Sequence, residues 1–389
     1  MRIKAVILLS LVPLLAQCAS SHRDKPPFEL AEGVFDYNQP VTLGLERIPQ
    51  AETVTIFAPE AETDRAYNHG VVMTAFKGRL YAQWQSSMRD EDAPETVISY
   101  AVSEDGKEWS SVQTLVPARE NAVITNGGWW VSGDTLTAYV NVWPDAKKDQ
   151  REGHVEYITG SDGLNWSDPL PVTDKGGMPI EGVIEQDLRA LPSGRILTSF
   201  HVAPGLVAKP HFTDNPDGVS GWVEGQLENL PSEGPVSREL EPSWYVRSDG
   251  AIVMVFRDQS SSFKTLASLS LDGGETWSPP ELIDFPDSRS KQSAGNLPDG
   301  IVFRVNNPTH DRTRYPLVIS LSEDGQLFDR AFLIRGEEDL PAMRFDGRYK
   351  RIGYSYPKSF VHAGSIYVSY ATNKERVEYT RIPISSIQY

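Results

Sequence analysis

The chain has 389 residues, with 37 Lys and Arg against 53 Asp and Glu, and a formal net charge of −16. Such an acidic chain is a poor partner for nucleic acid, although a local basic cleft is still compatible with an anionic sugar polymer. Its single cysteine, Cys18, excludes a disulfide within the chain, and it leaves no cysteine nucleophile or cysteine metal site in the part that follows.

Residues 1–18 have the pattern of an export signal. Arg2 and Lys4 precede an apolar run over 5–15 that is too short to span a bilayer. Residues 15–18 resemble a bacterial lipobox, which implies cleavage before Cys18, lipidation of Cys18 and an outer-membrane lipoprotein; plain secretion or a periplasmic location stays open. We expect 19–32 to be a tether and 33–389 to be one catalytic domain, monomeric and held at the membrane only by the lipid anchor.

A short box recurs along the chain, and Ser270–Trp277 is its clearest copy. Its Asp and Gly residues suit a tight turn between two strands, and its Trp suits the core beneath that turn. The aromatic residues that close the copies are Trp109, Trp166, Trp222, Trp277 and Phe328, at steps of 57, 56, 55 and 51 residues. A period near 50 with strand patterning predicts an all-β fold, a single β-propeller with one blade per repeat.

A second pattern repeats between the boxes: a turn glycine, an alternating apolar strand and then a polar residue. Six such strands occur, so the direct count is six blades. Seven blades stay open if residues 28–60 form a blade with the C-terminus; otherwise the strand 53–57 closes the ring against 376–383. The polar residues that end the strands are Gln85, Asn141, His201, Arg257 and Asn306.

Equivalent positions in successive blades lie on one rim of a propeller, so these strand ends are expected to converge on one mouth. Strand ends are often polar only because they meet water, and this interpretation is favoured for Gln85 and Asn141 taken singly. His201 beside Arg257 on the next blade favours a functional site instead.

The chain resembles the sialidase superfamily over nearly all of the part after residue 18. The resemblance rests on the Asp-box at 270–277, on Glu241-Pro242-Ser243 followed by Arg257, on Asn306-Asn307-Pro308 followed by Arg312 and Arg314, and on Gly353–Tyr356. It implies a glutamate and two of three carboxylate-binding arginines, with a tyrosine nucleophile near 356. The first arginine is absent, because His69 and Gly70 occupy that stretch, and hydrolysis of sialic acid is therefore not expected.

Residues 67–109 and 126–144 are more similar to two groups of sialidase-fold enzymes, ulvan lyases and rhamnosyl-glucuronate hydrolases. The ulvan lyases give our prediction: β-elimination at a uronate of a sulfated, rhamnose-rich polymer. Elimination needs a base, an acid and a cation that neutralises the carboxylate, and His201, Tyr245 and Arg257 are predicted for these roles, with His211 as a spare. The predicted substrate-binding residues are His69, Gln85, Asn141, Asn306, Arg312, Tyr315 and Tyr356.

Two alternatives remain. A hydrolase would use His69, by resemblance, or two carboxylates among Asp90, Glu91, Asp92, Glu181, Glu185, Asp187 and Glu241. A non-catalytic carbohydrate-binding propeller would keep the aromatic clusters without needing the catalytic set. No cofactor is required by any of these interpretations, and the sequence leaves a structural metal ion unknown.

Overall fold

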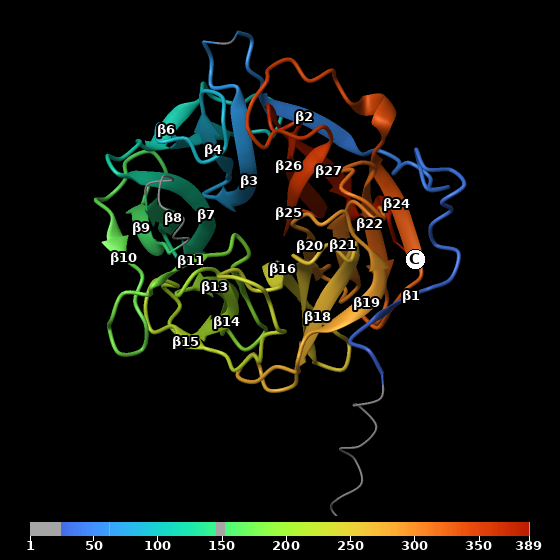
Figure 1. Cartoon of the computed structure of the whole chain (residues 1–389). Coiled ribbons are helices and arrows are strands. Elements are labelled where there is room, and N and C mark those ends of the chain that lie inside the picture. The colour runs from blue at the N-terminus through green and yellow to red at the C-terminus, as the bar shows by residue number, and fades with distance from the viewer. Residues whose placement is uncertain (1–24, 62, 145–151, 389) are drawn as a thin grey trace, which may run out of the picture.

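The computed structural model describes residues 25–61, 63–144 and 152–388, whose strands form six sheets around a central axis (Figure 1). Five sheets have four strands each. In the third, the innermost strand is split into two short segments. The all-β propeller is therefore confirmed with six blades, and the seven-blade alternative is wrong. The predicted export signal and its Cys18 lie outside the described residues.

The first three blades come from residues 67–224, and the strands of each blade are given from the innermost outward. The first is β3 (Tyr67–Phe76), β4 (Arg79–Ser87), β5 (Val97–Ser103) and β6 (Gln113–Val116). The second is β7 (Ala122–Ser132), β8 (Thr135–Pro144), β9 (His154–Gly160) and β10 (Leu170–Pro171). The third is β11 (Gly182–Ile184) with β12 (Arg189–Ala190), then β13 (Ile196–Val202), β14 (Val207–Thr213) and β15 (Val223–Glu224).

The last three blades follow in the same direction around the ring. The fourth is β16 (Glu239–Val246), β17 (Ile252–Asp258), β18 (Lys264–Ser270) and β19 (Glu281–Pro286). The fifth is β20 (Ser293–Asn296), β21 (Val302–Asn306), β22 (Leu317–Ser322) and β24 (Arg330–Arg335). The sixth is β25 (Tyr354–His362), β26 (Ser365–Thr372), β27 (Arg376–Pro383) and β2 (Glu52–Phe57). Two short 3₁₀ helices, η1 (Glu337–Asp339) and η2 (Ile384–Ser386), complete the elements.

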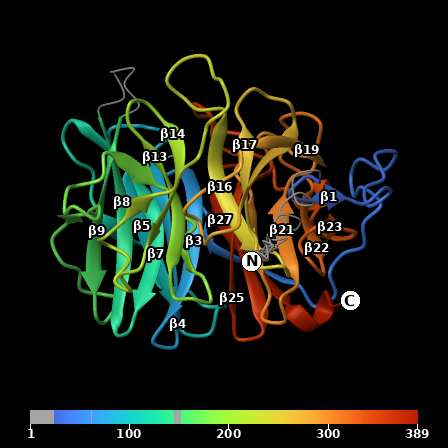
Figure 2. The ribbon, with the colours of Figure 1, turned by 90° about the horizontal axis from the view of Figure 1, so that it is seen from below.

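The ring closes by pairing the two ends of the chain. Strand β2 is antiparallel to β27, with Glu52 opposite Arg381 and Phe57 opposite Val377. The predicted closing strand is thus confirmed, and it covers the outer edge of β27 that would otherwise be unpaired. Figure 2 shows the ring turned by 90°, so that the blades are seen from the side.

The packed part of the chain begins before residue 33, which corrects the predicted tether of 19–32. Strand β1 (Glu29–Leu30) pairs in parallel with β23 (Leu327–Phe328). Phe28 is 1% exposed and its ring contacts those of Tyr245, Phe285 and Phe328. Burial of this aromatic side chain fixes the segment to the outside of the fourth and fifth blades.

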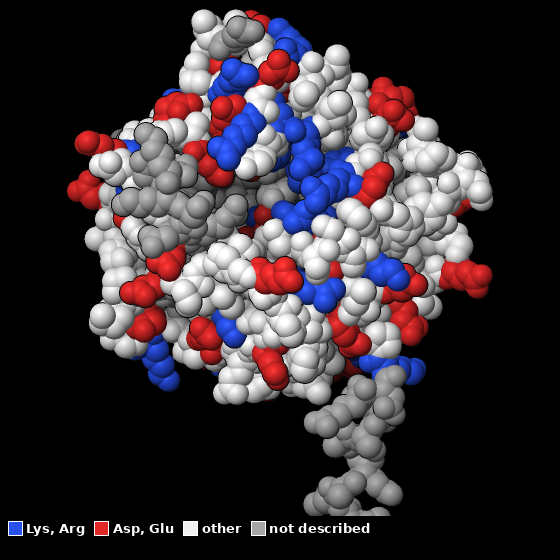
Figure 3. Space-filling view, in the orientation of Figure 1, with Lys and Arg blue, Asp and Glu red and all other residues white. Residues whose placement is uncertain are grey.

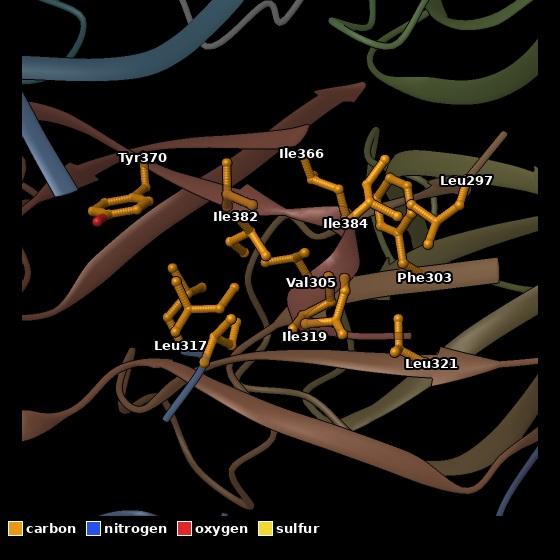
Figure 4. Packing of buried hydrophobic residues seen from close by; sticks show 14 of the residues in the cluster. Leu297, Phe303, Val305, Leu317, Ile319, Leu321, Ile366, Tyr370, Ile382 and Ile384 are labelled. Atoms are coloured by element: carbon orange, nitrogen blue, oxygen red, sulfur yellow. The ribbon is translucent and has the colours of Figure 1, made fainter. Parts of the chain in front are cut away.

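Each blade packs between two neighbouring blades. Because both of its faces are therefore buried, its middle strands carry apolar side chains on both sides. Along β17, Val253 and Val255 pack in one cluster with Phe285, whereas Ile252, Met254 and Phe256 pack in another with Trp277. Between the fifth and sixth blades, Val305, Leu317 and Ile319 meet Ile366 and Ile382 in a similar cluster (Figure 4). Among the described residues, no helix is long and apolar enough to cross a membrane.

The boxes lie on turns between the third and fourth strands of the blades, as the repeat predicted. In the box at 270–277, the Asp272 carboxylate accepts hydrogen bonds from the backbone N–H groups of Glu275 (3.1 Å) and Thr276 (2.9 Å). Tyrosines of neighbouring strands brace other copies: Tyr139 Oη donates to the carbonyl of Gly218 at 2.7 Å, and Tyr245 Oη donates to that of Gly325 at 2.9 Å. These bonds join one blade to the next box.

We predict that Asp272→Ala lowers the free energy of unfolding by about 1–2 kcal/mol, because two backbone donors lose their charged acceptor. Urea denaturation measures the change. Asp134→Ala removes an exposed carboxylate from another turn, where it forms a 3.4 Å ion pair with Lys77, and it should change stability by under about 0.5 kcal/mol. Equal stability of the two variants would contradict a structural role for the box carboxylate.

Candidate active site

Irregular backbone in the innermost strands directs two reactive side chains to the middle of the ring. The pairing of β16 with β17 shifts register between Leu240 and Ser243, and that of β25 with β26 shifts between Ser355 and Lys358. Glu241 (φ 51°) and Tyr356 (φ 56°) lie within these bulges in the left-handed region, which non-glycine residues rarely adopt. Bulges re-aim side chains beside active sites, and strained conformations gather there.

Tyr356, Glu241 and Arg257 form one hydrogen-bonded group, although they come from the sixth and fourth blades. Tyr356 Oη donates to Glu241 Oε1 at 2.5 Å. Arg257 Nη1 donates to Glu241 Oε2 at 2.8 Å and to Tyr356 Oη at 2.9 Å. One carboxylate oxygen of Glu241 and the Tyr356 phenol oxygen therefore share a single guanidinium nitrogen, and the other carboxylate oxygen accepts from the phenol.

The charges around this group determine its protonation. Burial alone would raise the pKa of Glu241, but the positive charges of Arg257 and Lys291 outweigh it and hold the pKa at about 2. Removal from water, together with the charge of Glu241, raises the pKa of Tyr356 well above its usual value. Glu241 is thus a carboxylate at neutral pH, and the proton is on the tyrosine.

Further cations surround the Tyr356 ring. Arg314 lies 5.3 Å from its centroid, with Nη1 donating to Ser355 Oγ at 2.8 Å, and the ammonium groups of Lys291 and Lys374 lie 5.3 and 6.0 Å from the centroid. Figure 3 shows Lys and Arg gathered over the middle of this face, while many Asp and Glu side chains lie farther out. The acidic chain thus carries a basic centre.

His69 packs against the ring of Tyr356, with 4.1 Å between the ring centroids. It is 2% exposed, and neither of its ring nitrogens has a hydrogen-bond partner among the described residues. Burial, followed by the charges of Lys374, Arg314 and Lys291, lowers the pKa of His69 well below its usual value. This histidine is therefore neutral, and the ring nitrogen that carries its lone pair accepts no hydrogen bond from the described residues.

Two further residues belong to the site: Glu91, which the sequence indicated only as one of seven candidate carboxylates, and Lys374, which it did not identify. Glu91 lies in the loop between β4 and β5, and its Oε2 is 2.7 Å from Lys374 Nζ. Backbone bonds between this loop and Arg348 hold it in place. Lys374 also approaches Tyr67 Oη at 3.4 Å. The basic turn after β26 carried no motif, so no pattern indicated Lys374.

His201 is close to the site but does not line it. Its Nε2 accepts the backbone N–H of Glu241 at 3.2 Å, and its Nδ1 lies 3.6 Å from Glu185 Oε1. It is 4% exposed, and burial lowers its pKa. The contacts make His201 a positioning residue that supports the bulge at Glu241, and they contradict its prediction as a base that reaches substrate.

Tyr245 lies in the core, which contradicts its predicted role as an acid. Its side chain is fully buried among Phe28 and Phe328, and its hydroxyl is bonded to the box of the fifth blade. Burial raises its pKa far above neutral. Tyr245 belongs with Tyr139 among the tyrosines that brace boxes. The spare candidate, His211, is also buried, and its Nδ1 lies 3.0 Å from the carbonyl of Lys209.

The predicted substrate-binding residues fall into two groups. Tyr356 and His69 are in the site. Arg312 is exposed on the loop that carries Arg314, and the half-buried Tyr315 packs against the core.

The other three predicted substrate-binding residues are buried polar side chains. Asn141 exchanges two hydrogen bonds with the backbone of Ile184, and Asn306 donates to Pro286 and Asp287. Gln85 faces His69 across the β3–β4 pairing. Asn141 and Asn306 therefore join strands and loops. Arg314, rather than Arg312, contacts the reactive group.

In the described ranges, no group of three or more His, Cys, Asp or Glu side chains is arranged to hold a metal ion.

Comparison with known proteins agrees with this architecture. The BNR repeat-like domain family matches residues 78–368, and the chain belongs to this family. A search of curated proteins found no match. Together with the Asp-boxes described above, this family match shows that the chain is a sialidase-like Asp-box propeller.

Solved structures with the same fold include several sialidases. One sialidase is 20% identical with a TM-score of 0.59; the match covers 92% of this chain but only 35% of that protein, so the chain spans about a third of its length. NanB sialidase from Streptococcus pneumoniae, as a K499G mutant, is 14% identical, with a TM-score of 0.61 and coverage of 86% and 71%. A protein of unknown function from Dyadobacter fermentans is 16% identical, with a TM-score of 0.63 and coverage of 86% and 100%. At these identities the likeness concerns the fold.

We predict that anion binding at this site weakens as pH rises through about 8. Burial lowers the pKa of Lys374 to about 8 despite its bond to Glu91, so its charge beside Tyr356 is lost above that pH. The dissociation constant of glucuronate, measured by calorimetry from pH 7 to 9, should rise roughly fivefold, as expected for one charge at intermediate dielectric.

Lys374→Arg keeps the charge across this range and should flatten the profile. Lys264→Arg makes the same exchange in a half-exposed ion pair with Asp284 on β18, and it should retain the wild-type profile. If Lys374→Arg also retained the profile, another group would be responsible for the titration.

Proposed function

We propose that the protein is a glycan-cleaving enzyme that acts on an acidic sugar, with Tyr356 as its nucleophile. The observation that carries this proposal is the hydrogen bond from Tyr356 to Glu241, held by Arg257 in a basic site. A tyrosine becomes a nucleophile when an adjacent base takes its proton. Arg257 and Arg314 are the groups best suited to hold a substrate carboxylate, because a guanidinium binds a carboxylate with two parallel hydrogen bonds.

Substrate binding itself would activate the pair. Glu241 is a weak base while Arg257 donates to it. A substrate carboxylate that competes for Arg257 weakens this bond, so the pKa of Glu241 rises and its ability to take the tyrosine proton rises with it. The free enzyme thus keeps Tyr356 protonated, and the bound state favours the phenolate.

The proposed reaction has two steps. In the first, Glu241 takes the proton of Tyr356, the phenolate oxygen bonds to the anomeric carbon, and the glycosidic bond breaks as the leaving oxygen takes a proton from the Glu91–Lys374 pair. In the second, water gives a proton back to that pair and attacks the anomeric carbon. Tyr356 leaves and recovers its proton from Glu241. A lysine with a pKa near 8 is suited to the acid role at neutral pH.

A uronate fits this site better than sialic acid. The resemblance to sialidases lacks the first arginine, and the structure has the neutral His69 in that region, with lysines rather than a third guanidinium nearby. The similarity of residues 67–109 and 126–144 to ulvan lyases and rhamnosyl-glucuronate hydrolases favours a rhamnose- and uronate-containing polymer. We retain export, with an outer-membrane lipid anchor at Cys18, as part of this proposal.

β-Elimination is the second candidate, and His69 favours it. A neutral histidine with no hydrogen-bond partner in the described chain is suited to take the C5 proton of a uronate. Arg257 would neutralise the carboxylate while the C4–O4 bond breaks, C4 and C5 form a double bond and O4 takes a proton from Tyr356 or Lys374. The predicted lyase chemistry then survives with His69 and Tyr356 in place of His201 and Tyr245.

We predict that Tyr356→Phe lowers turnover of ulvan oligosaccharides, or of rhamnosyl-glucuronate oligosaccharides, by roughly 10³-fold, because the variant lacks the reacting oxygen. Reducing ends and ultraviolet absorbance of unsaturated uronates are followed together. New reducing ends without absorbance support hydrolysis, and a parallel rise in both supports elimination.

Tyr157→Phe is the matched control, since it removes a phenol hydroxyl from β9 in the second blade, and it should keep wild-type turnover. His69→Ala separates the mechanisms further: elimination should fall by roughly 10²-fold or more, whereas hydrolysis should retain its chemical step. Near wild-type activity of Tyr356→Phe in both assays would contradict the proposal. Binding of the oligosaccharides by a wild-type protein that cleaves none of them would favour the binding module.

A further inference from the structure

Three arginines at the rim of the site form no ion pair with a carboxylate in the part of the chain that the structure describes. Arg289 precedes β20, Arg312 follows β21 and Arg351 precedes β25. No ion pair joins any of them to a carboxylate within the described ranges. The neighbouring acids are engaged by other groups: Asp258 by Arg238 (2.8 and 2.9 Å), Glu241 by Arg257, and Glu91 by Lys374.

Backbone hydrogen bonds connect the three loops that carry these arginines. The N–H of Ser288 donates to the carbonyl of Asn307 at 2.9 Å, which joins the loop of Arg289 to that of Arg312. The N–H of Tyr354 donates to the carbonyl of Arg314 at 2.8 Å, which joins the loop of Arg312 to that of Arg351. The arginines are thus held on adjacent segments next to Tyr356.

The positive charges also interact with one another. Burial, followed by repulsion from Arg257, Arg312 and Arg351, lowers the pKa of Arg289. A backbone φ of 56° places Arg289 in the left-handed region, as at Glu241 and Tyr356. This arrangement destabilises the free protein, and an anion placed among the arginines would relieve it.

Unsatisfied donors lie in the same loop. The hydroxyls of Ser288 and Ser290, each in a side chain 1% exposed, and Nε of Arg289 are buried without a hydrogen-bond partner among the described residues. Buried donors of this kind need an acceptor, and a multi-oxygen anion or water supplies one. The loop therefore combines unpaired charge with unpaired donors.

We infer that Arg289, Arg312 and Arg351 form a second anion subsite beside the carboxylate site of Arg257 and Arg314. Its ligand is a second anionic group of the glycan, either a sulfate ester or the carboxylate of a neighbouring sugar. This inference rests on the proposed function for the identity of the ligand as an acidic glycan. The inference adds that the substrate carries two anionic groups close together. A sugar with one negative charge would leave the charges of the rim arginines without a counterion.

The first experiment titrates sulfate into protein saturated with glucuronate, at constant ionic strength. Wild-type protein should bind sulfate, and Arg289→Gln/Arg312→Gln should raise its dissociation constant about tenfold or more, because two charge-assisted contacts are lost. Arg79→Gln/Arg381→Gln removes the same charge from exposed ion pairs with Glu104 and Glu52, and it should bind sulfate as the wild type does. Wild-type protein that binds no sulfate, or equal binding by the rim double variant, overturns a sulfate subsite.

A second titration, with acetate in place of sulfate, distinguishes a sulfate ester from the carboxylate of a neighbouring sugar as the natural ligand. Rim-dependent binding of sulfate alone assigns a sulfate ester, and rim-dependent binding of acetate assigns a neighbouring carboxylate. Glucuronate affinity should be unchanged in Arg289→Gln/Arg312→Gln; a parallel loss of glucuronate and sulfate would mean one shared site and would overturn the inference. If neither anion binds beside glucuronate, there is no second subsite.

These titrations need no bond cleavage, so they separate this inference from the proposed function. A protein that binds both anions but cleaves no glycan keeps the subsite and loses the proposed enzyme. A protein that cleaves through Tyr356 but binds no second anion keeps the enzyme and loses the subsite. If sulfate binds through the rim arginines but glucuronate does not bind at all, the proposed carboxylate site is wrong and the anion subsite at the rim is kept.

Discussion

The bulges in the innermost strands are the constraint on which the site depends. A regular strand presents alternate residues to the two neighbouring blades, and both of those faces are filled with core, as Val253 and Met254 show on β17. On the innermost strands β16 and β25, one side chain each reaches the site where the strand leaves its ladder. Glu241 and Tyr356 do so in left-handed conformations, each followed by a proline, which donates no backbone hydrogen bond. The cost of these conformations is offset by the core on either side.

The electrostatics of the chain operate at short range. The net charge of −16 repels an anionic polymer at a distance, but at physiological salt this field is screened over roughly 8 Å. Close to the axis, Arg257, Arg314, Lys291 and Lys374 dominate, because burial weakens the screening of their charges. Under the proposed function, affinity for an acidic sugar depends on the charges at the mouth rather than on the total charge.

The sequence predicted the fold well because the propeller repeats. Every box has the same local chemistry, so spacing alone indicated the blades and the closing strand at 53–57. The residues that carried the resemblance include Arg257 and Tyr356, which the structure brings into one hydrogen-bonded group. The prediction of Tyr245 was wrong because periodicity cannot distinguish a tyrosine that points outward to a box from one that points to the axis; both follow an apolar strand. Lys374, and the pairing that selects Glu91 among the candidate carboxylates, could not be predicted, because the two residues are 283 positions apart in the chain and only the folded ring brings their loops together.

Tyr356 is the group on which the two proposed chemistries converge. It contacts Glu241 through its hydroxyl and His69 through its ring face. With the anomeric carbon near its oxygen, the pair with Glu241 makes it a nucleophile; with C5 near His69, the same oxygen is placed to protonate a leaving group. The protein groups are common to both reactions, so the position of the bound sugar decides between them. Cations that fix the anionic groups of the glycan set that position, and the arginines at the rim thus act on the choice of reaction as well as on affinity.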